Sequence, residues 1–339
     1  MAGCSYASAA PKLHFAGNAK QGPFAPENFR SDPSGFYTTG VNRLVVHGVQ
    51  DATMVRYIAR TVEFLKWAKA RGARFDTTVE LDKWMADYLE DACYGREKGF
   101  DFGAQTFFGF LALFPEYKMK LSLSYRAYHT WKVIHVGGEG SAIPEEAVYI
   151  IIDFFEQQGL KEQAIITETS LDVYFRTHEW CQIRGEDIFD DGELVGLALG
   201  VAERNERVKT GRHQGVVLDS PYLRERWAEI KRLRKPHELA LSIAPNKFKE
   251  DWERAKAATG LSWIGPEHGL RHAGAARDVE QGTRTLEQVR RRGRWRALDS
   301  VQRYTKTWLF IKARSQMSAK QLEHGRKVLS SRPPRLIAG

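Results

Sequence analysis

Apolar residues recur at helical spacing through the first half of the chain. From Asp51, a suitable N-cap, apolar side chains follow one another every three or four residues until Gly72, which is the pattern of an amphipathic helix. A second apolar stripe covers 81–89, and shorter helical patterns cover 104–114 and 122–134. Four consecutive helices predict a small all-α domain.

The segments on either side of this helical region lack a sustained period. Residues 1–45 contain four prolines and five glycines and are expected to form a flexible arm. Three glycines and a proline stand between Val136 and Pro144, a composition typical of a linker. The sequence therefore predicts an arm at 1–45, a helical domain at 46–138 and a second domain at 139–339.

The second domain combines helical patterns with two short β segments. Segments 194–201 and 215–218 are rich in valine and leucine and flank the polar loop 203–214, which predicts two strands of a small sheet. Helical patterns occupy 144–158, 163–175, 221–234, 246–258, 267–280, 285–292, a short segment near Ser300, and 318–329. The expected fold is mainly α with a small β-sheet.

Length and composition narrow the class of protein. The 339 residues are 42% hydrophobic, enough apolar side chain for about two globular domains. The longest stretch of apolar residues and glycine, 194–202, is much shorter than the roughly 20 residues of a transmembrane helix, so no membrane partner is expected. Three cysteines without CxxC spacing offer neither a disulfide framework nor a cysteine zinc site, which favours a reducing compartment.

Positive charge is concentrated in the C-terminal part of the chain. Residues 1–200 carry 20 Lys+Arg and 27 Asp+Glu, a net −7, whereas residues 201–339 carry 31 and 15, a net +16. This basic region suits a polyanion such as double-stranded DNA. On charge alone a solvated basic surface is an equally good interpretation, so the choice depends on specific motifs.

Three short motifs in the basic region contain residues that can bind or react with phosphate. They are HGLRH at 268–272, GRW at 293–295 and RYTK at 303–306. His268 and Arg271 stand three apart, so on a helix both face one anionic group. His268 and His272 also have metal-ligand spacing, but no glutamate follows the first histidine, so we discount a metal. For any one residue a structural role stays open, with His268 as a helix cap or Arg271 paired with Glu267 or Asp278.

The combination of motifs resembles the tyrosine recombinases, the phage-integrase-like enzymes that break and rejoin DNA. The family pattern is Arg, Lys, His-x-x-Arg, His or Trp, and Tyr, and the resemblance covers about 50–315. RTHEWCQIRGEDI at 176–188 is similar to the block around the family's first arginine, although Tyr174 stands where the family usually has glycine. KTGR at 209–212 lies between the two predicted strands, where the family keeps a lysine on a hairpin.

The resemblance implies a catalytic role for six residues. Arg176 and Arg271 would stabilise the charge that develops on the phosphate. Tyr304 would attack the phosphate and form a covalent 3′-phosphotyrosine, and Lys209 would protonate the departing 5′ oxygen. His268 would bind phosphate or accept the nucleophile's proton. This scheme needs no metal, ATP or other cofactor.

Further residues are expected to support the site or to contact DNA. Trp295, the sixth catalytic candidate, would pack the site or donate its indole N–H, and Glu179 and His272 would support their neighbours. Without the motif, Trp295 would be interpreted as a core residue, and Arg176 with Glu179 as an exposed helix pair. The arginines expected to contact DNA are Arg212, Arg292, Arg294 and Arg296.

Taken together, the sequence favours a site-specific DNA recombinase or integrase that self-associates on DNA as a dimer or tetramer. Domain 46–138 would be the DNA clamp, although 51–150 carries 13 Lys+Arg against 14 Asp+Glu and so has no net attraction for phosphate. The tryptophan of GRW resembles integrases of eukaryotic mobile elements, which suggests the nucleus, or the cytoplasm and nucleoid in a prokaryote. Two alternatives stay open: a type IB topoisomerase and a non-catalytic DNA-binding descendant.

Overall fold

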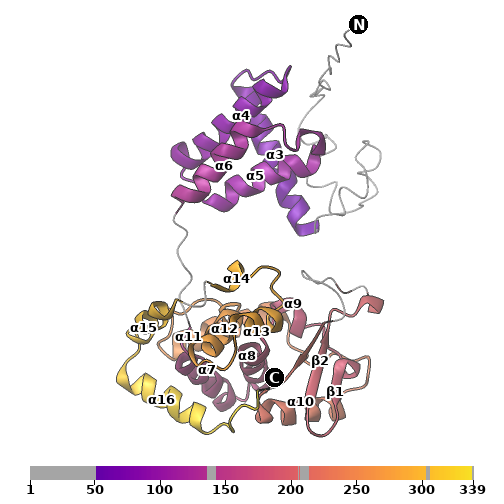
Figure 1. Cartoon of the computed structure of the whole chain (residues 1–339), viewed down its shortest axis with the longest axis vertical. Coiled ribbons are helices and arrows are strands. Elements are labelled where there is room, and N and C mark those ends of the chain that lie inside the picture. Colours follow the sequence, from indigo (N-terminus) through magenta and orange to yellow (C-terminus); the bar gives the residue numbers. More distant parts are fainter. Residues whose placement is uncertain (1–50, 136–142, 205, 207–213, 303–305, 338–339) are drawn as a thin grey trace. The chain divides into compact units, whose positions relative to one another are not determined.

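The computed structural model of the chain describes residues 51–135, 143–204, 206, 214–302 and 306–337. The chain divides into two compact units, Met1–Gly138 and Glu139–Gly339 (Figure 1). This division coincides with the glycine-rich boundary expected from the sequence. The arm expected at 1–45 lies outside the described residues.

The described part of the N-terminal unit is helical. Its main helices are α3 (Asp51–Ala70), α4 (Thr78–Glu90), α5 (Phe100–Leu113) and α6 (Ser122–Ile134). Helix α3 packs on α5, and α4 packs on α6. A Cβ at Gly109 of α5 would lie 2.9 Å from the Cα of Tyr57, so a glycine there lets the two helices approach closely. The core between them is aromatic and includes Phe64, Tyr88 and Phe110.

The C-terminal unit is built around the buried helices α7 and α8. Its α-helices are α7 (Glu145–Gln157), α8 (Lys161–Val173), α9 (Thr177–Trp180), α10 (Pro221–Leu233), α11 (Pro245–Ala258), α12 (Gly269–Glu280), α13 (Leu286–Arg292), α14 (Asp299–Gln302), α15 (Thr307–Arg314) and α16 (Ala319–Ser330). Helix α7 contacts α8, α11, α12 and α16, and its Ile151 and Ile152 are fully buried. Figure 1 shows α16, in yellow, at the edge of this unit.

A three-stranded antiparallel sheet lies beside α10 (Figure 1). Its strands are β1 (Ile188–Asp190), β2 (Val195–Leu199) and β3 (Gln214–Val217), in the order β1-β2-β3. Leu197 of β2 pairs with Ile188 on one side and with Val216 on the other. Alternate residues of β2 are buried, as expected for a sheet with one face on the core.

The expected fold class, mainly α with a small sheet, is confirmed. The helical patterns predicted from the sequence correspond to observed helices, and both predicted β segments are strands. Among the α-helices and strands of the described residues, β1, α9 and α15 were not predicted from the sequence. Within the described ranges, the helices are all too short or too polar to span a bilayer.

Candidate active site

A pocket of about 590 Å³ in the C-terminal unit collects residues that are far apart in the sequence. It is lined by Phe175, Arg176, Thr177, His178, His268, Arg271, His272, Arg294, Trp295 and Arg296. Four of the six predicted catalytic residues therefore share one cavity. The other two, Lys209 and Tyr304, lie outside the described residues, as does Arg212.

Arg271 is held at the start of α12 by two backbone carbonyls and an aromatic ring. Its guanidinium donates to the carbonyl oxygen of Tyr174 at 2.5 Å and to the carbonyl oxygen of Gly293. The guanidinium carbon also lies 4.2 Å from the ring centroid of Trp295, within the range of a cation–π interaction. These contacts, from the end of α8 and from the GRW motif, fix the plane of a guanidinium that is itself buried.

His268 immediately precedes α12 and is exposed. Its side chain makes no capping hydrogen bond to the helix, so the alternative in which His268 caps the helix through its side chain is wrong for this structure. Both His268 and Arg271 line the pocket, as their three-residue spacing predicts. His272, one residue further along, lines it as well.

Close packing of α12 against α8 brings Arg271 to Tyr174. A Cβ at Gly274 of α12 would lie 2.1 Å from the carbonyl oxygen of Leu171, so a larger residue there would push the helices apart. Tyr174 ends α8 with φ 57° and ψ 51°, a left-handed conformation that costs a non-glycine residue about 1–2 kcal/mol. Tyrosine here therefore adopts the backbone conformation that glycine adopts most easily.

Arg176 is fixed by the acidic residue three positions later. Glu179 accepts a hydrogen bond from the Arg176 guanidinium at 2.5 Å and another from the Arg176 backbone N–H at 2.7 Å. The Glu179 side chain is only 1% exposed, so the alternative of an ordinary exposed helix pair is wrong. Burial alone would raise the pKa of Glu179, but the charges of Arg294 and Arg176, with the backbone N–H, lower it below its usual value.

The GRW motif folds its tryptophan back over its glycine. A Cβ at Gly293 would lie 1.7 Å from the indole of Trp295, so any side chain at this position would displace the ring. Arg294 between them has a φ of 56° and donates to Glu179 at 2.6 Å. Trp295 is half-buried, and its ring lies 6.1 Å from that of Tyr174. Trp295 is therefore a wall of the pocket and also packs against the core.

His178 lines the pocket, although the sequence analysis did not select it. Burial lowers its pKa, and the neighbouring charges of Arg176, Arg271 and Arg294 lower it further, while Glu179 opposes them. The imidazole is therefore neutral at neutral pH. Its position inside the RTHE segment, between Arg176 and Glu179, is the signal that could have identified it.

The arginines expected to contact DNA differ in their surroundings. Arg296 is exposed at the pocket, as a DNA-contacting residue should be. Arg294 lines the pocket, but its side chain is 5% exposed and is paired with Glu179.

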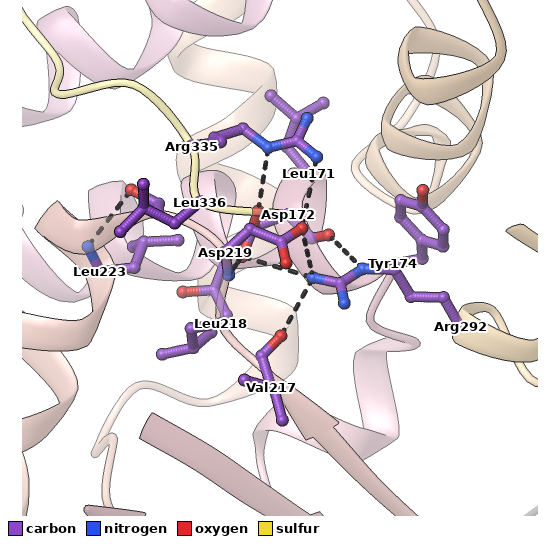
Figure 2. Close-up of polar contacts among 12 residues, drawn as sticks. Leu171, Asp172, Tyr174, Val217, Leu218, Asp219, Leu223, Arg292, Arg335 and Leu336 are labelled. Atoms are coloured by element: carbon purple, nitrogen blue, oxygen red, sulfur yellow. Dashed lines mark hydrogen bonds and ion pairs between the residues drawn. The ribbon is translucent and has the colours of Figure 1, made fainter. Parts of the chain in front are cut away.

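The expectation of a DNA contact does not hold for Arg292. Its guanidinium points inward to the carbonyl oxygens of Asp172 at 3.0 Å and Val217 at 3.1 Å, and to the carboxylate of Asp219 at 3.0 Å (Figure 2). Arg292 is a structural residue because buried carboxylates, absent from its own sequence neighbourhood, draw it away from the surface.

The pocket is suited to an anionic group. Four guanidinium groups line it, from Arg176, Arg271, Arg294 and Arg296, and the buried carboxylate of Glu179 neutralises only part of their charge. One guanidinium group can donate hydrogen bonds to two phosphate oxygens at once, and it stabilises negative charge that develops on those oxygens. In the part of the chain that the structure describes, no cluster of histidine, cysteine and acidic side chains is arranged to hold a metal ion.

No protein-family model and no curated protein matches the chain. Among solved structures, it is similar to the XerH site-specific recombinase bound to palindromic difH substrate in a post-cleavage complex, with a TM-score of 0.52, 13% identity and 78% of each chain covered. A lambda integrase dimer bound to a COC′ core site gives a TM-score of 0.48 at 15% identity, with 77% of this chain and 73% of that chain covered. The chain has the fold of the tyrosine recombinases.

Proposed function

We propose that this protein is a site-specific DNA recombinase that cleaves and rejoins double-stranded DNA through a covalent 3′-phosphotyrosine. The observation that carries the proposal is the pocket, where Arg176, His268, Arg271 and Trp295 meet from three separate segments. The resemblance to the tyrosine recombinases implies a catalytic role for each of these four residues. A shared cavity is what a common reaction centre requires.

The pocket arginines would act on the phosphate as its charge changes. When an oxygen attacks a phosphodiester, negative charge grows on the non-bridging oxygens, and donors already in place stabilise it without reorganising. Arg271 is held by two carbonyls and Arg176 by Glu179, so both guanidinium groups are oriented before DNA binds. This pre-orientation supports a role in the transition state as well as in binding.

The covalent step would use Tyr304 as nucleophile and Lys209 as acid. The Tyr304 oxygen would form a bond to phosphorus while the bond from phosphorus to the 5′ oxygen breaks, and His268 would accept the tyrosine proton. Lys209 would give a proton to the 5′ oxygen, which leaves as a hydroxyl. Rejoining would reverse these steps, with a 5′ hydroxyl of the same or a partner strand as nucleophile. Metal and ATP take no part.

Strand exchange between two DNA partners needs more than one active site. We therefore extend the proposal to self-association on DNA as a dimer or tetramer, with the helical N-terminal unit as the second DNA-binding part. The XerH complex, which shares the fold, is bound to its difH substrate. This relationship supports DNA as the partner of the present chain.

The proposal is tested with duplexes that trap the covalent product. The full chain is incubated with nicked duplexes that carry the DNA flanking its coding sequence, alongside a pool of nicked duplexes of random sequence. A nick close to the cleavage site releases a short strand, so the adduct accumulates. We expect a covalent complex that resists denaturation, with the DNA attached to Tyr304 by peptide mapping.

Two variants control this experiment. Tyr304→Phe keeps the ring, removes the nucleophile and should form no adduct, whereas Tyr222→Phe removes a hydroxyl that only bonds Glu156 and should form it normally. An adduct that survives in Tyr304→Phe, or that needs magnesium, contradicts the mechanism. Relaxation of supercoiled plasmid with no joining of separate duplexes would instead indicate a topoisomerase.

A further inference from the structure

Tyr174 connects the pocket with a second polar network on the other side of its backbone. Its carbonyl oxygen accepts hydrogen bonds from Arg271 at 2.5 Å and from Arg294 at 3.1 Å, two arginines that line the pocket. Its ring also packs against Trp295. One backbone carbonyl therefore orients two guanidinium groups of the proposed reaction centre.

The hydroxyl of Tyr174 reaches the second network. It donates to the carboxylate of Asp278, which is completely buried. Asp278 also accepts from Arg277 at 3.1 Å, Arg284 at 2.6 Å and Arg335 at 2.8 Å. The charges of Arg277 and Arg335 lower the pKa of Asp278 against the effect of burial, so this carboxylate stays ionised and accepts the tyrosine hydrogen bond.

Two further carboxylates belong to the same network. Figure 2 shows Asp172 and Asp219 between the guanidinium groups of Arg292 and Arg335. Arg292 lies 3.0 Å from Asp219, and Arg335 lies 3.5 Å from Asp172 and 3.3 Å from Asp219. These contacts connect Asp172, at the end of α8, with Asp219, which follows β3, with Arg292 of α13 and with Arg335 near the C-terminus. Many contacts therefore fix the position of the end of α8.

We propose that Tyr174 is a positioning residue for DNA cleavage, and that its hydrogen bond to Asp278 sets the direction of the carbonyl that orients Arg271 and Arg294. The proposal rests on the proposed function, since it concerns the same pocket. Tyr174 holds a left-handed conformation, φ 57°, which a tyrosine leaves easily unless another contact retains it. The bond to Asp278 is such a contact, and its loss would let the peptide, with its carbonyl, rotate.

The experiment compares one variant that removes this bond with another that weakens it. Tyr174→Phe removes the hydroxyl, and Asp278→Asn removes the charge of the acceptor. Tyr149→Phe is the matched control, because Tyr149 is also a buried tyrosine of the same unit but does not line the pocket. For each full-length variant, single-turnover cleavage of the nicked duplex gives a rate constant and an amplitude, and thermal unfolding gives the stability.

A positioning role changes the rate constant, whereas a purely structural role changes the amplitude. We expect Tyr174→Phe to lower the cleavage rate constant about tenfold, the effect of one hydrogen bond, with unchanged amplitude. The double variant should be no slower than Asp278→Asn alone, because the tyrosine hydroxyl acts through that carboxylate. A wild-type rate constant in Tyr174→Phe, or a loss confined to amplitude, overturns the proposal.

A second measurement decides the question without cleavage. Inorganic vanadate resembles a phosphate under attack, and its binding to the full chain can be followed by calorimetry. We expect Tyr174→Phe to weaken vanadate binding about tenfold and Tyr149→Phe to leave it unchanged, since only the former alters the guanidinium groups. Equal affinity in both variants overturns the positioning role. If the wild-type chain forms no DNA adduct, the proposed function is contradicted, and vanadate binding still tests whether Tyr174 orients the guanidinium groups.

Discussion

The two units stabilise their buried carboxylates in different ways. In the N-terminal unit, Asp82 accepts hydrogen bonds from the backbone N–H groups of Leu123 and Ser124, each at 2.8 Å, and from the Ser124 hydroxyl at 2.6 Å. These donors are neutral and stand at the start of α6, where free N–H groups favour an anion. In the C-terminal unit, by contrast, arginines surround Asp219 and Asp278.

The two interiors also differ in how deeply their ion pairs are buried. Among the described residues of the N-terminal unit, the ion pairs that Arg60 and Arg96 form have side chains that are 28–36% exposed. Arg277 and Arg284 of the C-terminal unit are only 4% and 5% exposed. Burying charge is costly, and an apolar core of the same shape is often more stable. In the C-terminal unit, the buried arginine–carboxylate pairs lie around the end of α8. This is the segment that orients the pocket arginines.

Removing a guanidinium group from the pocket should slow the proposed reaction more than any other change considered below affects the protein. Arg271→Ala should lower the rate of adduct formation on the order of 10³-fold, because it removes a donor from the proposed transition state. It should weaken DNA binding as well, since it deletes a phosphate contact. Arg56→Ala, an exposed arginine of α3, is the control and should cleave normally. A comparable loss in both variants would mean that the chemistry is not confined to the C-terminal unit.

The second prediction compares the two kinds of buried carboxylate directly. Asp219→Asn leaves Arg284, Arg292 and Arg335 short of a counter-charge and should reduce the free energy of unfolding by about 4 kcal/mol. Asp82→Asn loses only the charge on bonds to neutral donors and should cost about 1 kcal/mol. Urea unfolding of the full chain measures both. Equal costs would remove the contrast between the units.

The third prediction concerns Glu168 of α8, whose pKa is raised to about 7 by burial. Arg332 opposes this shift, and Glu156 and Asp172 add to it. Because the folded pKa exceeds the unfolded one, the stabilisation is complete below about pH 4.5 and is lost as the pH rises through 7. Glu168→Gln does not titrate, so its stability relative to wild type should increase by about 3 kcal/mol or less between pH 4.5 and pH 8.

Urea unfolding of both proteins at those two pH values measures this change. Glu162→Gln is the control, because Glu162 lies on the same helix but is about a quarter exposed. A stability difference between Glu168→Gln and wild type that does not vary with pH would show that folding does not raise the pKa of Glu168.

The smallest change is expected in the salt dependence of DNA affinity. Arg296 is exposed at the pocket, so Arg296→Ala should reduce the slope of log affinity against log salt by about 0.9, the value of one phosphate contact. Arg56→Ala should leave the slope unchanged, because residues 51–150 carry no net positive charge. An equal reduction in both variants would show that the N-terminal helices also hold the DNA backbone by charge.

Long amphipathic helices were the part of the fold that could be predicted from the sequence. The buried stripe of α4, which includes Leu81, Met85 and Leu89, has a clear helical period. Helix α15 was missed because its apolar residues do not form one stripe: Trp308 and Ile311 are exposed while Phe310 is buried. Strand β1 has only three residues, too few for a period to appear.

The site could be predicted as far as its residues belong to motifs. The motifs and the family resemblance that they carry indicated Arg176, His268, Arg271 and Trp295, which the structure gathers in one pocket. The inward direction of Arg292 could not be predicted in this way. Its neighbours are arginines that indicate a surface, and its carboxylate partners Asp172 and Asp219 are far away in the sequence.

The attachment of Arg335 beneath Tyr174 also bears on how the chain folds during its synthesis. The N-terminal unit is complete at residue 138, but the interior of the C-terminal unit lacks one of its cations until residue 335 has been made, roughly 200 residues later. At about 5–20 residues per second, this interval lasts on the order of 10 to 40 s. The helical unit can therefore fold on the ribosome first, while the pocket takes its final geometry only afterwards.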